Sequence, residues 1–260
     1  MVLSAAGGPR QRAEGAPQEG AAAAVGAGAE LPGATGAGPE LRRVRWSAAC
    51  RIVPTRHPPV NLFDRVADAA DFEALYALEA MTNERVRDEL GEIERVPRAE
   101  RQFGPGSGPV MAAFTHVNTL GSRFSDGSYG MFYAARDRAT AVAETRYHHG
   151  RFLAATRQGP MHLPMRLYHV AIDGRLHDLR PPGAVADAVY DSDDYTLSRR
   201  LGAALRARGS HGVAYRSVRH ARGQCVGLFR PGPASRCLHA AVLLYAWDGE
   251  RFTDVYEKTE

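Results

Sequence analysis

The stretch GSRFSDGSYGMFYAARDRATAVAETRYHHG, residues 121–150, contains the pattern of a buried strand followed by a helix. Aromatic and small residues run from Tyr129 to Ala135, which is typical of a short buried strand. Asp137 is a favoured N-cap residue, so a helix is predicted from there to His149, with Gly150 as its natural end. A strand that passes directly into a helix is one unit of a mixed α and β architecture.

Segments on both sides of this unit add further strands and a few helices. Two more helices are predicted: one capped by Asp71 with an apolar stripe at Phe72, Leu75, Tyr76 and Leu78 towards Met81, and one with Leu197, Leu201 and Leu205 that ends at Gly209. The other predicted strands are 51–60, which prolines interrupt, 110–117, 166–172, 212–217, 224–229, 238–247 and 251–256, with turns at Asp173–Gly174 and Asp248–Gly249. Together they predict an α+β fold, a single domain with a largely antiparallel mixed sheet flanked by helices.

The composition changes abruptly near residue 41. Residues 1–40 are mostly Ala, Gly, Pro, Glu and Gln and contain no aromatic side chain. Such a segment buries too little apolar surface to offset the entropy lost on ordering, so a disordered Ala/Gly/Pro-rich tail is predicted. Residues 41–260 are predicted to form one domain, with Trp46 as its first large apolar residue.

Charge and cysteine content exclude several classes of protein. The net charge is +4, but the arginines are scattered among acidic residues, so no direct contact with nucleic acid is expected. Cys50, Cys225 and Cys237 are an odd number without a CxxC pair, which excludes a disulfide framework and a cysteine-built zinc site. The longest strongly apolar run, Leu238–Trp247, is much shorter than the ~20 residues of a membrane helix. With no signal-like N-terminus either, a cytoplasmic protein without a membrane association is expected.

Several polar residues are candidates for chemistry. Arg123 precedes a glycine-rich turn, Tyr133 lies on the predicted strand, and Glu144 lies on the helix among small side chains. From spacing alone, a glutamate on a helix is more often simply solvated. Adjacent His148 and His149 point in different directions on a helix and make a poor metal pair, so no metal is expected. Asp191–Asp194 precedes a helix, which favours N-capping over a metal loop.

Several motifs in this order resemble the RES domain, a family named for its arginine, glutamate and serine. The resemblance is carried by GSRFSDGSYGMFYAARDRATAVAETRYHH at 121–149 and by GSHGVAYRSVR at 209–219, which the apolar strand GQCVGLF follows. Upstream, RIVPTRHPPVNLFDRV, TNER at 82–85 and MAAFTHVN extend it, so that it covers about residues 46–229. One departure lies after Ser217, where many members have an asparagine and this chain reads Gly-Gln-Cys-Val at 223–226.

The resemblance implies a fold like that of ADP-ribosyltransferases and an enzyme that degrades NAD⁺. It further implies a toxin restrained by an antitoxin of the Xre or helix-turn-helix class, and a possible homodimer. NAD⁺ would be the substrate, so no separate cofactor is expected. By resemblance, Arg123, Tyr133, Glu144 and Ser217 occupy the functional positions of the family.

The chemistry of NAD⁺ cleavage suits these four residue types. Breaking the nicotinamide–ribose bond leaves positive charge on the ribose, which a preorganised carboxylate such as Glu144 can stabilise. The planar guanidinium of Arg123 matches phosphate oxygens of the diphosphate, and the Tyr133 ring offers a face to the cationic nicotinamide. Ser217 can orient the carboxylate or the ribose through a hydrogen bond.

The residues leave the acceptor of the ADP-ribose group open. Water or phosphate would give hydrolysis or phosphorolysis, whereas a macromolecular acceptor would make the protein an ADP-ribosyltransferase. The remaining alternative is a non-catalytic module that binds nucleic acid or a regulator, which would have no need of the carboxylate.

Overall fold

The computed structural model describes residues 38–57, 62–66, 68–73, 91–183 and 187–258 of the 260-residue chain. The predicted tail lies outside the described residues up to residue 37, as does the apolar stripe predicted from Leu75 to Met81. Residues 69–73 are helical, and the N–H groups of Ala70 and Asp71 donate to Asp68 Oδ1 at 2.8 and 2.9 Å. The predicted cap at Asp71 was therefore wrong, because Asp68 accepts the free N–H groups of this turn.

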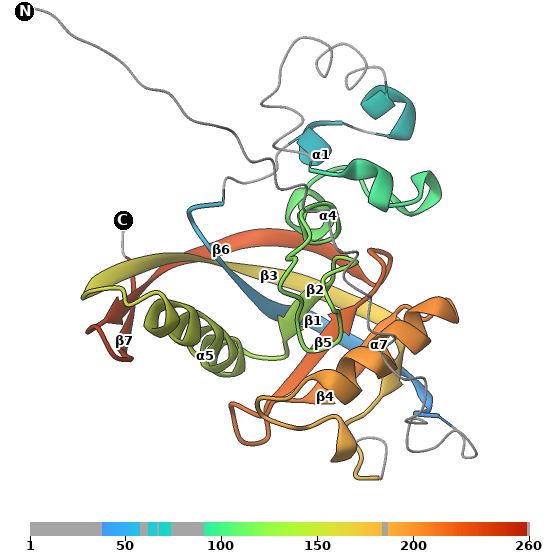
Figure 1. Cartoon of the computed structure of the whole chain (residues 1–260). Coiled ribbons are helices and arrows are strands. Elements are labelled where there is room, and N and C mark those ends of the chain that lie inside the picture. Colours follow the sequence, from blue (N-terminus) through green and yellow to red (C-terminus); the bar gives the residue numbers. More distant parts are fainter. Residues whose placement is uncertain (1–37, 58–61, 67, 74–90, 184–186, 259–260) are drawn as a thin grey trace, which may run out of the picture. The chain divides into compact units, whose positions relative to one another are not determined.

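Seven strands form the centre of the described chain (Figure 1). They are β1 (Leu41–Pro54), β2 (Phe132–Ala135), β3 (Met161–Asp178), β4 (Gly212–Arg216), β5 (Gln224–Leu228), β6 (Ala234–Trp247) and β7 (Phe252–Glu257). The helices are α1 (Leu62–Arg65), α4 (Gly108–Thr115), α5 (Arg138–Ala155) and α7 (Thr196–Ala207), with the short 3₁₀ turns η1 (Ile93–Arg95) and η2 (Arg98–Glu100). No helix among the described residues is long and apolar enough to span a membrane.

The strands form one mixed sheet in the order β1-β2-β5-β4-β3-β6-β7. Every neighbouring pair is antiparallel except β3 and β4, which run parallel over a short register. The long strand β3 also pairs with β1, so that β1, β2, β5, β4 and β3 close into a ring from which β6 and β7 extend. The predicted α+β fold with a largely antiparallel mixed sheet is confirmed.

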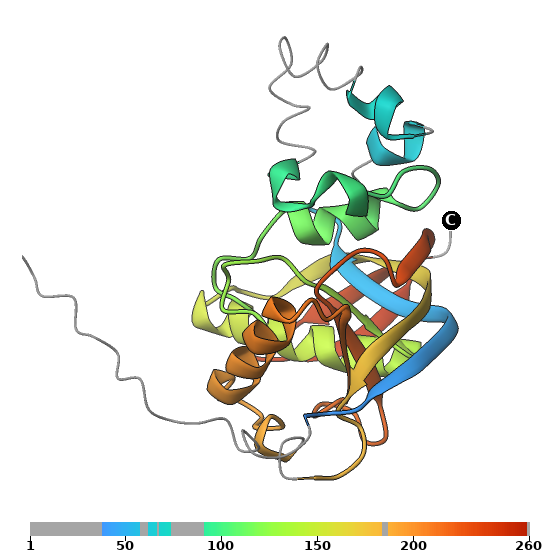
Figure 2. The same ribbon diagram turned by 90° about the vertical axis from the view of Figure 1, so that its right-hand side faces the viewer.

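Both faces of the sheet are buried, and neighbouring residues on a strand serve different cores. On β4, Val213 and Tyr215 join one core while Ala214 joins the other, as the alternation of side chains along a strand requires. Leu153 of α5 and Leu201 of α7 pack in the core of Val213. Phe114 of α4 packs in the opposite core. Figures 1 and 2 accordingly show α4 and α5 on opposite sides of β3 and β6.

Helix α4 replaces the strand that was predicted at 110–117. Its apolar residues are buried almost throughout, and an apolar run of this length fits a buried helix as well as a buried strand. Pro109 stands in the first turn, where its missing N–H costs no hydrogen bond, and this feature favours the helix.

Two predicted ends are also wrong. Helix α5 continues past Gly150 to Ala155, because Leu153 in its last turn is buried in the core. Strand β3 continues through Asp173 and Gly174, which pair with Arg45 and Val44 of β1 rather than forming a turn. In both cases tertiary contacts outweigh the local preference of glycine for an end or a turn.

Two glycines inside helices are expected to respond oppositely to alanine. At Gly202 of α7 an added Cβ would lie 2.1 Å from the carbonyl oxygen of Phe124, so Gly202→Ala should lower the free energy of unfolding by about 1–3 kcal/mol. At Gly150 of α5 the nearest atoms would be ring carbons of Phe252 and Trp247 at 3.7 Å, so Gly150→Ala should raise it by about 0.5–1 kcal/mol. Urea denaturation of both variants beside the parent measures this, and shifts in the same direction would contradict the packing described.

Candidate functional site

Helix α5, which carries Glu144, begins at a hydrogen-bonded N-cap. The N–H of Thr140 donates to Asp137 Oδ1 at 2.8 Å, which confirms the predicted cap. The hydroxyl of Thr140 donates to Asp137 Oδ2 at 2.9 Å and also lies 3.0 Å from His220 Nδ1. The first turn of α5 is thereby bonded to the loop between β4 and β5, which carries Ser217.

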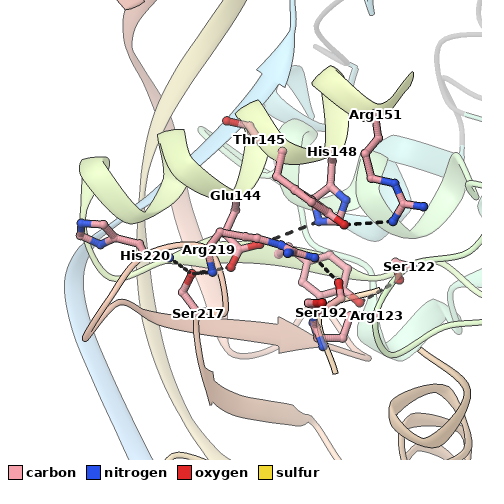
Figure 3. Close-up of polar contacts among 12 residues, drawn as sticks. Ser122, Arg123, Glu144, Thr145, His148, Arg151, Ser192, Ser217, Arg219 and His220 are labelled. Carbon is pink, nitrogen blue, oxygen red and sulfur yellow. Dashed lines mark hydrogen bonds and ion pairs between the residues drawn. The ribbon is translucent and has the colours of Figure 1, made fainter. Parts of the chain in front are cut away.

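Ser217 holds the carboxylate of Glu144. Its hydroxyl donates to Glu144 Oε1 at 2.6 Å and accepts the backbone N–H groups of Arg219 and His220, both at 3.0 Å (Figure 3). Because the two amides occupy its lone pairs, the hydroxyl proton is directed to the carboxylate. The bond is short, as expected for a hydroxyl donating to a carboxylate, and the Glu144 side chain remains 18% exposed.

Tyr133 lies on β2, and its hydroxyl is used within the protein. It accepts the N–H of Phe124 at 3.2 Å and lies 2.8 Å from Ser122 Oγ, so it holds the turn before β2. Burial raises the pKa of Tyr133 to about 12, which keeps the phenol protonated. An added Cβ at Gly227 would lie 3.0 Å from the Tyr133 ring, so the ring packs closely on β5.

Arg123 is buried and bonds to backbone carbonyls. Its Nη1 donates to the carbonyl oxygens of Val189 and Asp191 at 3.1 and 2.8 Å, and its guanidinium carbon lies 4.4 Å from the centre of the Tyr195 ring. Ser198 Oγ donates to the Arg123 carbonyl at 2.6 Å. Arg123 thus fixes the segment that leads into α7.

Glu144 and Arg123 affect the pKa values of two buried residues, Tyr215 and Cys225, and Tyr133 also affects that of Tyr215. Burial raises the pKa of Tyr215 well above its usual value; the charge of Glu144 and the Tyr133 phenol add to this effect, and Arg123 opposes it. Burial likewise raises the pKa of the Cys225 thiol, again with Glu144 and Arg123 acting in opposite directions. The charges of Glu144 and Arg123 therefore act on the same two buried residues of β4 and β5.

The same face of α5 carries residues that the sequence analysis did not select. Tyr147, His148 and Arg151 follow Glu144 by three, four and seven positions, a spacing that places them on one side of a helix. In Figure 3 Glu144, His148 and Arg151 face the loop with Ser217 and Arg219. The periodicity of α5 would have revealed these side chains once Glu144 was chosen.

His148 is neutral at neutral pH. Desolvation first, then the charges of Arg219 and Arg123, lower its pKa to about 4, although half of the side chain is exposed. Its Nε2 lies 3.8 Å from Glu144 Oε2, and with an uncharged imidazole this contact is no ion pair. Glu144 therefore keeps an uncompensated carboxylate oxygen beside a neutral ring.

The acidic segment Asp191–Asp194 precedes α7, but the predicted N-capping is met only in part: the N-cap residue is Tyr195, whose side chain makes no cap hydrogen bond, and one bond from the segment reaches the helix. Asp194 Oδ1 accepts the N–H of Thr196 at 2.8 Å, and Asp191 Oδ1 accepts those of Asp193 and Asp194, both at 2.7 Å. Among the described residues no group of three or more His, Cys, Asp or Glu side chains could hold a metal ion. A cavity of about 270 Å³ between Tyr129, Arg206 and Arg230 has none of the four candidate residues in its lining.

The fold and the site define an α+β domain in which a helix glutamate is held by a serine from the loop between two central strands. A sequence model described as RES domain matches residues 93–248. An uncharacterized protein, y4oC of Sinorhizobium fredii (strain NBRC 101917 / NGR234), is 31% identical over 209 residues, covering 79% of this chain and 85% of the relative. The chain belongs to the RES domain family.

One solved structure is similar at low identity. The crystal structure of the M. tuberculosis MbcT–MbcA toxin–antitoxin complex aligns with 84% of this chain and 87% of that chain, at 12% identity and a TM-score of 0.42.

The two adjacent histidines of α5 predict a specific loss of stability in mild acid. The pKa values of His148 and His149 are lowered to about 4 in the folded protein. Between about pH 6.5 and 4 the unfolded chain binds protons that the folded chain does not, so the free energy of unfolding falls as the pH decreases through this window.

Replacing both residues, His148→Gln with His149→Gln, should reduce this slope, leaving the contributions of His57 and His177, whose pKa values burial also lowers. Denaturation at several pH values between about 4 and 7 measures the slope. Equal slopes in parent and double variant would show that the two imidazoles titrate normally.

Proposed function

We propose that this protein cleaves the nicotinamide–ribose bond of NAD⁺. The observation that carries the proposal is the Glu144 carboxylate, fixed at 2.6 Å by a serine hydroxyl whose own direction two backbone amides determine. A carboxylate that is held by a neutral donor, with 18% of its side chain still exposed, can face a developing positive charge.

In the proposed step the C–N bond between the ribose C1′ and nicotinamide breaks, and its electron pair leaves with the nicotinamide nitrogen. The ribose then carries oxocarbenium character, which the negative charge of Glu144 stabilises. An acceptor oxygen bonds to C1′ and loses its proton. Water as acceptor gives ADP-ribose, and phosphate gives the corresponding phosphorylated product.

The remaining candidate residues have supporting roles in this proposal. Ser217 positions the carboxylate. The ring of Tyr133 would offer a face to the cationic nicotinamide. Arg123 would support the dinucleotide site by fixing the loop through the carbonyls of Val189 and Asp191.

An enzyme that consumes NAD⁺ depletes a metabolite its own cell needs. By its family resemblance we propose that the protein acts as a toxin in the cytoplasm. A partner antitoxin of the Xre or helix-turn-helix class would restrain it. A homodimer belongs to the same proposal.

Glu144→Gln tests the carboxylate with minimal change in shape. It should lower kcat for nicotinamide release by about 10²–10³-fold, as expected when a preorganised electrostatic group is lost. The assay follows nicotinamide and ADP-ribose from NAD⁺ with and without phosphate, and Glu250→Gln, at an exposed turn, is the matched control.

Absence of nicotinamide release from the folded parent protein under both conditions would rule out the proposed activity. Labelled ADP-ribose recovered on a macromolecule rather than free would favour a transferase, and salt-sensitive nucleic-acid binding without release would favour a binding module.

Ser217→Ala tests the positioning of the carboxylate. Removing the hydroxyl leaves Glu144 free to rotate and leaves two N–H groups without their acceptor, so kcat should fall by about 10–100-fold, as for loss of a hydrogen bond to a charged group. KM should change little, because Ser217 acts through Glu144. Partial recovery of kcat in Ser217→Thr would distinguish positioning from a loss of folding, and an equal loss in both variants would contradict this role.

A further inference from the structure

Two arginines lie next to the Glu144 site without a full set of partners. Arg219 follows Ser217 by two residues, and its guanidinium carbon lies 3.2 Å from the centre of the Tyr147 ring. Its Nη2 donates to the carbonyl of Ser192, and its buried Nε has no hydrogen-bond partner among the described residues. A buried guanidinium N–H without an acceptor is costly, so this group can gain from an additional anionic oxygen.

Arg151 completes the pair from α5. Its Nη1 lies 3.0 Å from the Tyr147 hydroxyl and 3.2 Å from Asp193 Oδ1, and the Tyr147 hydroxyl also donates to Asp193. Arg151 and Asp193 have 58% and 65% of their side chains exposed. An exposed ion pair contributes little net stability, so a competing anion can replace Asp193.

Three guanidinium groups lie around His148, and one of them, that of Arg151, is paired with the Asp193 carboxylate. Arg219, Arg123 and Arg151 all lower the pKa of His148. These three positive charges therefore act on the same part of α5. Asp193 itself is bonded to Ser192, Tyr147 and Arg151, and these three groups together with the charge of Arg219 lower the pKa of its carboxyl group.

We infer that Arg219 and Arg151 form a diphosphate subsite beside Glu144, in which Asp193 and the Ser192 carbonyl stand in for the phosphate oxygens. The inference rests on the proposed NAD⁺ site and names the part of it that binds the diphosphate. Glu144 and Arg151 are seven positions apart on α5, about 10 Å along the axis, so the subsite lies beyond the ribose that Glu144 faces.

The two arginines suit a diphosphate better than Arg123 does. Arg123 is buried and its Nη1 already serves two backbone carbonyls. Arg219 has an unused Nε, and planar guanidinium groups bind phosphate oxygens two at a time. The Tyr147 ring, stacked under Arg219, keeps the guanidinium plane oriented.

The first arm of the test compares two substrates that contain the same scissile bond. NAD⁺ has the diphosphate, and nicotinamide riboside lacks it. Arg219→Gln should raise KM for NAD⁺ by about 10–100-fold, as expected for lost hydrogen bonds to a charged group, and should leave kcat/KM for nicotinamide riboside within about twofold. Arg151→Gln should act in the same direction, and Arg200→Gln, an exposed arginine of α7, is the matched control.

Asp193→Asn gives an effect of opposite sign that misfolding cannot imitate. Removing the competing charge should lower KM for NAD⁺ several-fold while thermal stability stays near that of the parent. Equal losses of Arg219→Gln on both substrates, or an unchanged KM for NAD⁺, would overturn the subsite, as would a raised KM in Asp193→Asn.

The second arm is independent of catalysis. Calorimetric titration of ADP should show binding to the parent, to Glu144→Gln and to Arg200→Gln, with at least about tenfold weaker binding to Arg219→Gln. Nicotinamide release without this ADP binding would overturn the subsite and leave the proposed function intact. ADP binding without any release would support the subsite and reject the proposed function.

Discussion

The hydrogen bond between Ser217 and Glu144 joins the two parts of the structure on which the site depends. One end lies on α5, whose start Asp137 fixes, and the other lies in the loop that connects β4 to β5. A second link, from Thr140 to His220, runs between the same two elements. The loop can approach α5 this closely because residue 223 is glycine: an added Cβ there would lie 2.7 Å from the Thr140 side chain.

The position of the site follows from a sheet that is buried on both faces. Because side chains alternate, the residues of β2, β4 and β5 on the side of α5 include Tyr133, Tyr215 and Cys225, while their immediate neighbours enter the opposite core. These three side chains lie on the side of the sheet on which α5 supplies the carboxylate. Burial of Tyr215 and Cys225 there raises their pKa values, because it penalises their charged forms.

Local sequence signals predicted those features that local chemistry determines. The cap at Asp137 and the strands on both sides of the Asp248–Gly249 turn could be located because each depends on neighbouring residues. The errors have a common cause in tertiary contacts. Gly150 does not end α5 because Leu153 is buried beyond it, and the apolar residues of α4 gave no period that separates a buried helix from a strand.

In the candidate site, too, the sequence predicted single residues but not the tertiary contacts between distant segments. Sequence motifs selected Glu144, Ser217, Tyr133 and Arg123, and the structure brings Ser217 into contact with Glu144. The stacking of Arg219 on Tyr147 and the contacts of both with the 191–194 loop join three distant segments, and no local pattern encodes such pairings.

The Glu144 carboxylate and the nearby guanidinium groups are bonded to different partners. Among the described residues no arginine or lysine lies within ion-pair distance of Glu144, whose partners are a serine hydroxyl and an imidazole that burial keeps neutral. The nearby guanidinium groups are instead directed at the carbonyls and the Asp193 carboxylate of the 189–194 segment. A guanidinium bound to Glu144 would neutralise its carboxylate, whereas arginines bonded to the 189–194 segment leave that charge available for the proposed cationic ribose.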